Sequence, residues 1–291
     1  SGDSDRVGLG YAFCNEAFGA EANPLDVCRV LHEAGYTGVE LAPFTFNETA
    51  IPLNYKNVVE LTQNRVREWK EATAQFGLQV LGLHWLGVKV EQVHFTSNDG
   101  YVQGLGVYYL QQLCHICAEL GGKVLVLGSP KQRSLLDGMT KDEAFRMLAK
   151  VLNIVGDTAG KCGVQIALEP LGPAETDIVN TCAEALQVIE MAGSPNVGLH
   201  LDVKAMCSEC SESTKVPDLI RLHGARALHF HANDANLRGP GAGDTDFVPI
   251  FQALRGSEYG GWVSVEVFDF KPDPQTIARE SIAYMRRCAV Q

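Results

Sequence analysis

The chain has 291 residues, 46% of them hydrophobic, enough to bury one large core, and α/β barrels of this size are commonly single domains. A formal net charge of -11 and an isoelectric point of about 5.2, without a basic cluster, argue against a nucleic-acid partner. No stretch approaches the roughly 18 apolar residues that span a bilayer, so no membrane partner is expected.

Short β-branched runs alternate with longer amphipathic stretches along the whole chain, a pattern typical of parallel strands joined by helices. The predicted strands, in chain order, are 7–14, 37–41, 79–84, 123–127, 165–169, 197–202, 227–231 and 262–267. Helical patterns such as 57–76 and 141–159 lie between them, and glycines suited to left-handed helix ends follow several: Gly35, Gly77, Gly121, Gly163 and Gly193. This alternation predicts a (β/α)8 TIM barrel, with residues 1–291 forming one domain.

The glycine pattern and the cysteines narrow the class of protein further. Gly8, Gly10 and Gly19 lack the G-x-G-x-x-G spacing and the following helix of an open dinucleotide-binding sheet. The nine cysteines are an odd number spread through apolar segments, which indicates reduced thiols and a cytoplasmic protein. The start of the sequence lacks the basic and apolar regions of a signal peptide. Long irregular stretches follow predicted strands at 42–56, 87–100, 128–139 and 233–246, where barrel loops form the active-site face.

Acids and imidazoles gather at the carboxyl ends of the predicted strands. They are Glu40, His84 with Trp85, Glu169, His200 with Asp202, His229 with His231, and Glu266. Because burying such groups without partners is costly, their repetition at one end of a barrel indicates a functional site.

Four of these residues come from consecutive strands five to eight: Glu169, Asp202, His231 and Glu266. Three carboxylates and one imidazole facing one point would repel each other unless a cation lay between them. This set of donors suits Mn²⁺, Mg²⁺ or Co²⁺, with Zn²⁺ as a further option. The alternative for any single acid is that it caps the next helix or pairs with a neighbouring base.

The histidines have several interpretations. His229 and His231 share one face of their strand, so one would bind the metal while the other contacts substrate or lies in the layer below. His200 is expected one layer deeper, as an interior histidine with its hydrogen bonds satisfied. His84 and Trp85 could hold a sugar through a hydrogen bond and an apolar ring face, with packing at the barrel rim as the alternative.

Four segments carry a family resemblance: EPL at 169–171, LD at 201–202, HFHANDANLRGPGAGDTD at 229–246 and VE at 265–266. With these segments the chain resembles the xylose-isomerase-like barrels, which include ketose 3-epimerases, hydroxypyruvate isomerases, inosose dehydratases and, more distantly, endonuclease IV. In ketose 3-epimerases the four matching positions ligate one divalent metal, and the two glutamates also exchange the proton at the epimerised carbon. The resemblance therefore implies that Glu169 and Glu266 are the acid and base, and that Asp202 and His231 complete the metal site.

The same resemblance implies substrate contacts. Glu175 stands where ketose 3-epimerases carry a second glutamate that contacts the sugar, and Arg238 falls one residue from their substrate-binding arginine. Those enzymes have Asp-x-x-His after strand six, whereas this chain has Asp-Val-Lys-Ala, ending at Ala205. Lys204 would supply a polar contact instead or be solvated, and this departure leaves the substrate open.

The function that the resemblance implies is a divalent-metal-dependent isomerase or epimerase of a keto-sugar, with proton transfer through an enediolate that the metal stabilises. The alternatives are a metal-dependent dehydratase of a cyclic polyol or ketone such as an inosose, and a barrel that only binds a ligand. An endonuclease IV-like nuclease would need further histidines, which are missing at Ser129 and Ala205. A homodimer or homotetramer would be consistent with such a barrel.

Overall fold

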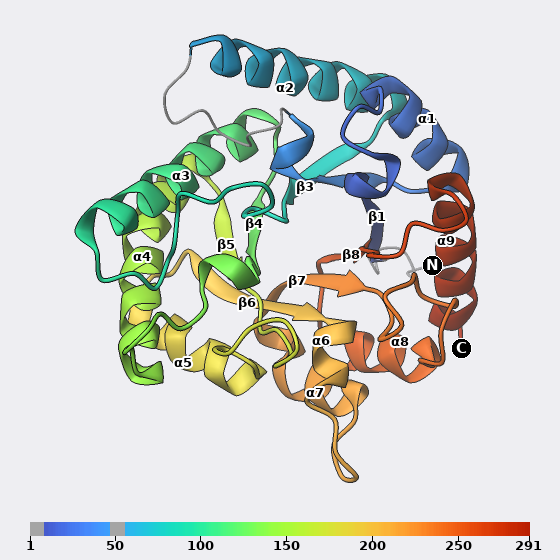
Figure 1. Ribbon diagram of the computed structural model, residues 1–291. Helices are drawn as coiled ribbons and strands as arrows, with labels where there is room; N and C mark the ends of the chain where they lie inside the picture. Colours follow the sequence, from blue (N-terminus) through green and yellow to red (C-terminus); the bar gives the residue numbers. More distant parts are fainter. Residues whose placement is uncertain (1–8, 47–55) are drawn as a thin grey trace, which may run out of the picture.

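The computed structural model describes residues 9–46 and 56–291, without the side chains of 56–61. Eight parallel strands close into a barrel in sequence order, and the helices form a ring around it (Figure 1). The strands are β1 (Gly10–Cys14), β2 (Gly38–Leu41), β3 (Gln79–Leu83), β4 (Val124–Leu127), β5 (Gln165–Leu168), β6 (Val197–Asp202), β7 (Ala227–Ala232) and β8 (Trp262–Val265). The predicted TIM barrel is confirmed, and each predicted strand is present, most with slightly shorter bounds. Val7 and Gly8 of the first predicted strand lie outside the described residues.

The helices follow the strands in the expected alternation. The α-helices are α1 (Pro24–Ala34), α2 (Lys56–Phe76), α3 (Gly100–Glu119), α4 (Lys141–Cys162), α5 (Cys182–Ala192), α6 (Val203–Cys207), α7 (Val216–His223), α8 (Phe247–Gly256) and α9 (Pro274–Ala289). Short 3-10 helices are η1 (Asn15–Phe18), η2 (Pro43–Thr45), η3 (Pro130–Gln132) and η4 (Gly224–Arg226). Part of the predicted loop 42–56, residues 47–55, lies outside the described residues. In the described part of the chain, no helix has the length and apolar character that a membrane crossing requires.

Local sequence signals fix the helix ends. The five glycines expected after helices all have positive φ, which confirms the prediction: Gly35, Gly77, Gly121, Gly163 and Gly193. The N-terminus of α4 has a capping box, in which the Thr140 hydroxyl accepts from the Glu143 amide and the Glu143 carboxylate accepts from the Thr140 amide. All nine cysteines are free thiols.

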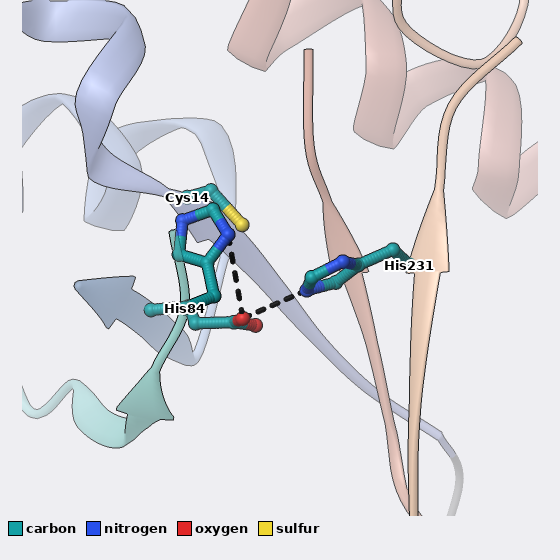
Figure 2. Close-up of side chains that lie close together, drawn as sticks. Cys14, His84 and His231 are labelled. Atoms are coloured by element: carbon teal, nitrogen blue, oxygen red, sulfur yellow. Dashed lines mark hydrogen bonds and ion pairs between the residues drawn. The ribbon is translucent and has the colours of Figure 1, made fainter. Parts of the chain in front are cut away.

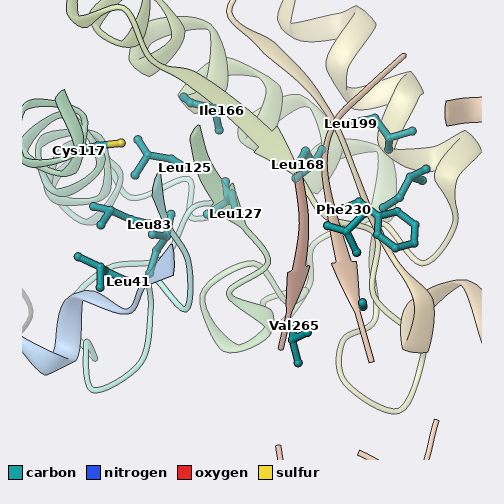
Figure 3. Close-up of a cluster of buried hydrophobic side chains, with 14 of the residues drawn as sticks. Leu41, Leu83, Cys117, Leu125, Leu127, Ile166, Leu168, Leu199, Phe230 and Val265 are labelled. Atoms are coloured by element: carbon teal, nitrogen blue, oxygen red, sulfur yellow. The ribbon is translucent and has the colours of Figure 1, made fainter. Parts of the chain in front are cut away.

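The strands place alternate residues on the two sides of the barrel wall. Large apolar side chains face outward and pack against the helices (Figure 3): Leu41, Leu83, Leu125, Leu127, Ile166, Leu168, Leu199, Phe230 and Val265. The residues between them face the barrel axis. In β7, for example, His229 and His231 face inward on either side of the outward Phe230. Burial of the outer layer therefore fixes which side chains line the interior.

The interior is divided into an apolar lower half and a polar upper half. Val124 and Leu228 lie near the amino ends of β4 and β7, in a separate buried cluster with Val126 and Ala167. Trp262 lies over Gly10 and Gly38, where an added Cβ would come within 2.5 Å and 2.9 Å of the indole ring. These glycines leave room for the indole, so an apolar ring lies at the amino ends of β1, β2 and β8.

Candidate active site

The upper interior gathers the polar residues predicted at the strand ends. Their side chains are almost fully buried, and the least buried is Glu169 at 7% exposure. Across β6 and β7, Asp202 pairs in register with His231 and His200 pairs with His229, so the side chains form two layers. The barrel thus holds titratable groups at a depth where each needs a partner of opposite charge, a hydrogen bond or a cation.

The four predicted metal ligands lie close together. Nδ1 of His231 is 3.5 Å from Oε2 of Glu266 and 4.0 Å from Oδ2 of Asp202. Donor atoms of Glu169, Asp202 and His231 all lie within 4.8 Å of one another. Nδ1 of His231 is buried and has no hydrogen-bond partner among the described residues, although it faces these carboxylates. An unpartnered ring nitrogen beside three carboxylates fits a divalent cation that accepts nitrogen and oxygen ligands.

The carboxylates of this group affect one another's proton affinity. Burial, followed by repulsion from Asp202 and Glu266, holds the pKa of Glu169 well above its usual range. Burial and the Glu266 charge raise the pKa of Asp202 to about 6. Burial also acts to raise the pKa of Glu266, but His231 and His84 outweigh it and bring that pKa well below the usual range. Such mutual repulsion is the electrostatic pattern that a bound cation would relieve.

Asn233 ties two of the carboxylates together. Its Nδ2 donates to Oδ2 of Asp202 at 2.7 Å and lies 3.3 Å from Oε1 of Glu266, while its Oδ1 accepts from the Lys204 amide at 2.8 Å. The sequence prediction omitted Asn233, although it lies only two residues after His231 in the segment that carries the resemblance.

Glu40 binds the two histidines of β7. Its Oε1 accepts from Nε2 of His229 at 2.6 Å, and its Oε2 accepts from Nε2 of His231 at 2.7 Å. Figure 2 shows Cys14, His84 and His231 close together, and donor atoms of these three residues and of Glu40 lie within 4.8 Å of one another. Donation by Nε2 leaves Nδ1 of His231 as the free ring nitrogen, and His229 lies in the layer below, one of its two predicted positions.

His200 differs from its prediction. Both of its ring nitrogens are buried and lack a hydrogen-bond partner within the described part of the chain, so the expectation of a satisfied interior histidine is wrong. Its ring packs 4.3 Å from the His231 ring, and burial followed by the charges of His231 and His229 holds its pKa well below the usual range. The ring centroids of His229 and His231 lie 5.5 Å and 4.3 Å from that of His200, so among the described residues its ring packs on other rings and makes no hydrogen bond. His200 also has a donor atom within 4.8 Å of those of Glu169, Asp202 and His231.

Glu266 is held by two consecutive residues at the end of β3. Nδ1 of His84 lies 3.1 Å from Oε2 of Glu266, and Nε1 of Trp85 donates to the same oxygen at 3.0 Å. Nε2 of His84 contacts Oε2 of Glu16 at 2.8 Å. Both ring nitrogens of His84 are therefore engaged with protein carboxylates. A contact from His84 or Trp85 to a sugar remains a prediction.

A cavity of about 340 Å³ opens above these residues at the loop end of the barrel. Glu169, Glu266 and Glu175 line it, together with Trp85 and Phe268. The Trp85 and Phe268 rings are stacked, with their centroids 5.7 Å apart. An apolar wall facing carboxylates suits a sugar, whose C–H faces pack on aromatic rings while its hydroxyls bind polar groups.

Lys204 lies next to this cavity rather than in solvent. Its side chain is 11% exposed, and Nζ lies 2.8 Å from Oε2 of Glu175 and 4.3 Å from the centroid of the Phe268 ring. Burial acts to lower its pKa, but Asp202 and Glu175 outweigh this and raise it. The two predicted substrate contacts Lys204 and Glu175 are thus brought together as an ion pair.

Arg238 is directed elsewhere. It lines a second cavity of about 260 Å³ between the loop after β7 and α9, together with Lys271, Glu280 and Arg287. It is not among the residues that line the cavity above Glu266. Its predicted role in substrate binding remains a prediction that this arrangement does not support.

The sequence prediction omitted Arg133, a buried cation next to the site. It is fully buried, and its guanidinium donates to the carbonyl oxygens of Glu169 at 2.5 Å and of Val179 at 3.1 Å. Burial lowers its pKa to about 10, and the carboxylates of Glu169 and Glu175 oppose the effect. Arg133 thus fastens the loop after β5 that carries both glutamates. No spacing in the sequence marks it out.

Comparison with known proteins finds sugar epimerases among the proteins to which this chain is similar. A 3-dehydro-D-guloside 4-epimerase from Escherichia coli (strain K12) is 25% identical over 287 residues, which cover 94% of this chain and 98% of that protein. A ketose 3-epimerase from Arthrobacter globiformis is 30% identical over 206 residues, or 70% of this chain and 68% of the relative. The crystal structure of a 3-keto-D-glucoside 4-epimerase from E. coli has the same fold, with a TM-score of 0.80 at 23% identity over 97% of this chain and 100% of that one.

These relatives are sugar epimerases, and the protein is an enzyme of the isomerase and epimerase class. The profile of the family described as xylose isomerase-like TIM barrel matches residues 28–288. The chain therefore belongs to the xylose isomerase-like TIM barrel family.

Proposed function

We propose that the protein is a divalent-metal-dependent epimerase of keto-sugars. The observation that carries the proposal is the approach of Glu169, Asp202 and Glu266 to the unpartnered Nδ1 of His231 beneath an open cavity. Buried carboxylates that repel each other are stable as a group when a cation lies among them. These residues would hold Mn²⁺, Mg²⁺ or Co²⁺, or in their place Zn²⁺.

A bound cation would supply positive charge next to the carbonyl and hydroxyl oxygens of the sugar, where negative charge develops when a neighbouring carbon loses its proton. The protein supplies the rest of the chemistry. Glu169 and Glu266 come from β5 and β8, and both line the cavity. A glutamate on each side of the carbon can remove the proton from one face and return another from the opposite face, which inverts that centre.

The surrounding residues would bind and orient the sugar. Trp85 and Phe268 offer aromatic surface to its C–H faces, and the Lys204 and Glu175 pair offers a donor and an acceptor to its hydroxyls. The relatives are named for both free ketoses and a keto-glycoside. We propose a keto-sugar of one of these two kinds as substrate, and the assay must therefore include both.

The test is an incubation of the Mn²⁺-loaded protein in D2O with free ketoses, such as D-fructose, D-psicose and L-ribulose, and with a 3-keto-glucoside. NMR should show a new epimer that carries deuterium at a single carbon. Recovery of every sugar unchanged and without deuterium would refute the proposal. A product that has lost water would instead identify the dehydratase alternative.

Two variants assign the proton transfers. Glu266→Gln and Glu169→Gln should each abolish epimerisation, because the amide cannot accept the proton. Glu190→Gln, on the outer helix α5, is the control and should leave the rate unchanged. Undiminished deuterium exchange in Glu266→Gln would remove Glu266 from the chemistry.

A further inference from the structure

The side chains of His84 and Trp85 converge on one oxygen, although consecutive residues of an extended strand point to opposite sides. Trp85 has φ +52°, a left-handed conformation that is uncommon for a bulky residue. This turn follows β3 directly and brings the indole N–H to Oε2 of Glu266 beside the imidazole of His84. Backbone strain at such a position is found where the surrounding structure requires a particular side-chain direction.

Glu16 lies on the far side of the His84 ring. Its side chain is buried at 2% exposure, and its Oε2 lies 2.8 Å from Nε2 of His84. Its other oxygen, Oε1, is buried without a hydrogen-bond partner among the described residues. A buried carboxylate with one engaged oxygen is costly to retain for packing alone, so its contact with His84 needs an explanation.

The neighbouring residue fixes the place of Glu16. Glu16 and its neighbour Asn15 stand in η1, immediately after β1. Oδ1 of Asn15 accepts from the Ala42 amide at 2.8 Å, and its Nδ2 donates to the Thr45 hydroxyl at 3.0 Å. These bonds tie the end of β1 to η2, the 3-10 helix after β2. Glu16 is thus presented to His84 from a rigid part of the barrel rim rather than from a free loop.

From this geometry we infer that Glu16 is a positioning residue for Glu266 that acts through His84, an inference that rests on the proposed function. Glu16 holds the imidazole so that its Nδ1–H, with the Trp85 N–H, keeps Oε2 of Glu266 in one direction. Asn233 meets the other oxygen, Oε1, at 3.3 Å. The plane of the Glu266 carboxylate is therefore set from three sides. Proton transfer depends steeply on such alignment, whereas sugar binding does not.

The test compares Glu16→Gln, His84→Gln and the double variant at saturating Mn²⁺. Glu16→Gln should lower kcat by about 10- to 100-fold with little change in KM, because a neutral amide orients the imidazole less firmly than the carboxylate, and this affects the reacting group rather than binding. In the His84→Gln background, the Glu16 substitution should have no further effect on kcat, because the imidazole that connects Glu16 with Glu266 is already absent. Glu209→Gln is the control, a half-buried glutamate that accepts from the Cys182 amide away from the cavity.

Crystal structures of the wild type and of Glu16→Leu, which removes both carboxylate oxygens, give a measurement that does not depend on activity. The inference predicts that Oε2 of Glu266 leaves its position against His84 and Trp85 in the variant while the barrel is unchanged. An unchanged Glu266 carboxylate, or additive effects of the two substitutions on kcat, would overturn it. If the wild type is inactive on every keto-sugar, the proposed function fails, and the two structures still decide the role of Glu16. Trp85→Phe, which keeps the ring and removes the N–H donor, should displace the same oxygen.

Discussion

Glu40 accepts a hydrogen bond from Nε2 of His231 at 2.7 Å, which leaves Nδ1 of the same ring facing Asp202 and Glu266. A carboxylate in this position fixes the tautomer and the direction of a metal-binding imidazole. In Glu40→Gln the single amide oxygen cannot accept from both His229 and His231. We expect Mn²⁺ affinity to fall by about 10- to 100-fold in calorimetric titration. An affinity equal to that of the Glu190→Gln control would show that Glu40 does not orient the ligand.

The raised pKa of Asp202 predicts how the metal-free fold responds to pH. Burial and Glu266 raise this pKa to about 6, against about 3.9 for an unfolded chain. A folded state that holds the proton more tightly gains stability below pH 4, and this contribution is lost as the pH rises through 6. With EDTA, the free energy of unfolding of wild type should therefore fall relative to Asp202→Asn between pH 4 and 7 in urea titrations.

Mn²⁺ should reverse that trend in the wild type, because the cation binds the deprotonated carboxylate. At a concentration 100-fold above its dissociation constant, a ligand specific for the folded state adds about 2.7 kcal/mol. Mn²⁺ should raise the free energy of unfolding of Asp202→Asn by a smaller amount. If the difference in free energy of unfolding between wild type and Asp202→Asn does not change with pH or with Mn²⁺, the assignment of Asp202 to the metal site is contradicted.

The ion pair of Lys204 and Glu175 is predicted to act in substrate binding. Lys204→Met keeps the aliphatic stem but removes the ammonium group that lies 2.8 Å from Glu175. A hydrogen bond to a charged group contributes about 1.5–3 kcal/mol, so KM for the keto-sugar should rise by about tenfold or more. Lys141→Met removes an ammonium that pairs with Glu184 at 2.6 Å on the outer surface, and steady-state kinetics of this control should match wild type. Equal KM values in both variants would place Lys204 outside the binding site.

Removal of Arg133 should destabilise the whole barrel. Arg133→Met leaves the buried carbonyls of Glu169 and Val179 without their donor, and each unsatisfied group costs about 1–3 kcal/mol. We expect a loss of about 2–4 kcal/mol in the free energy of unfolding, measured by urea titration. Arg146→Met, which breaks an exposed pair with Asp142, should change it by less than about 1 kcal/mol. Similar values for the two variants would mean that other donors replace the buried guanidinium.

The sequence was sufficient to predict the barrel because alternation on the strands follows burial. The inward direction of His231 follows from the outward direction of Phe230, and the rule that barrel strands end in functional groups selects Glu169, Asp202 and Glu266. The same rule would also have selected Glu16, two residues past the end of β1. Glu40 was identified by position, but its role depends on contacts with β7 across the barrel.

Other features of the site depend on backbone geometry that residue types do not reveal. The left-handed conformation of Trp85 sends its indole N–H to Glu266, and nothing in the letters HWLG marks that turn. Arg238 falls near a substrate-binding position in the resemblance, yet its loop places it in another cavity beside α9. A residue at the right place in a motif still needs the correct backbone direction to reach the site.

The cavity that Glu169 and Glu266 line also determines how hydrogen isotopes reach the site. Both carboxylates share this opening with the sugar. While a sugar occupies the cavity, the proton that one glutamate removes stays on that glutamate, and the proton returned to the opposite face comes from the other glutamate. Because this second glutamate exchanges with solvent whenever the cavity is empty, each turnover in D2O should place deuterium in the epimer. Incomplete incorporation would indicate that a single group carries out both transfers.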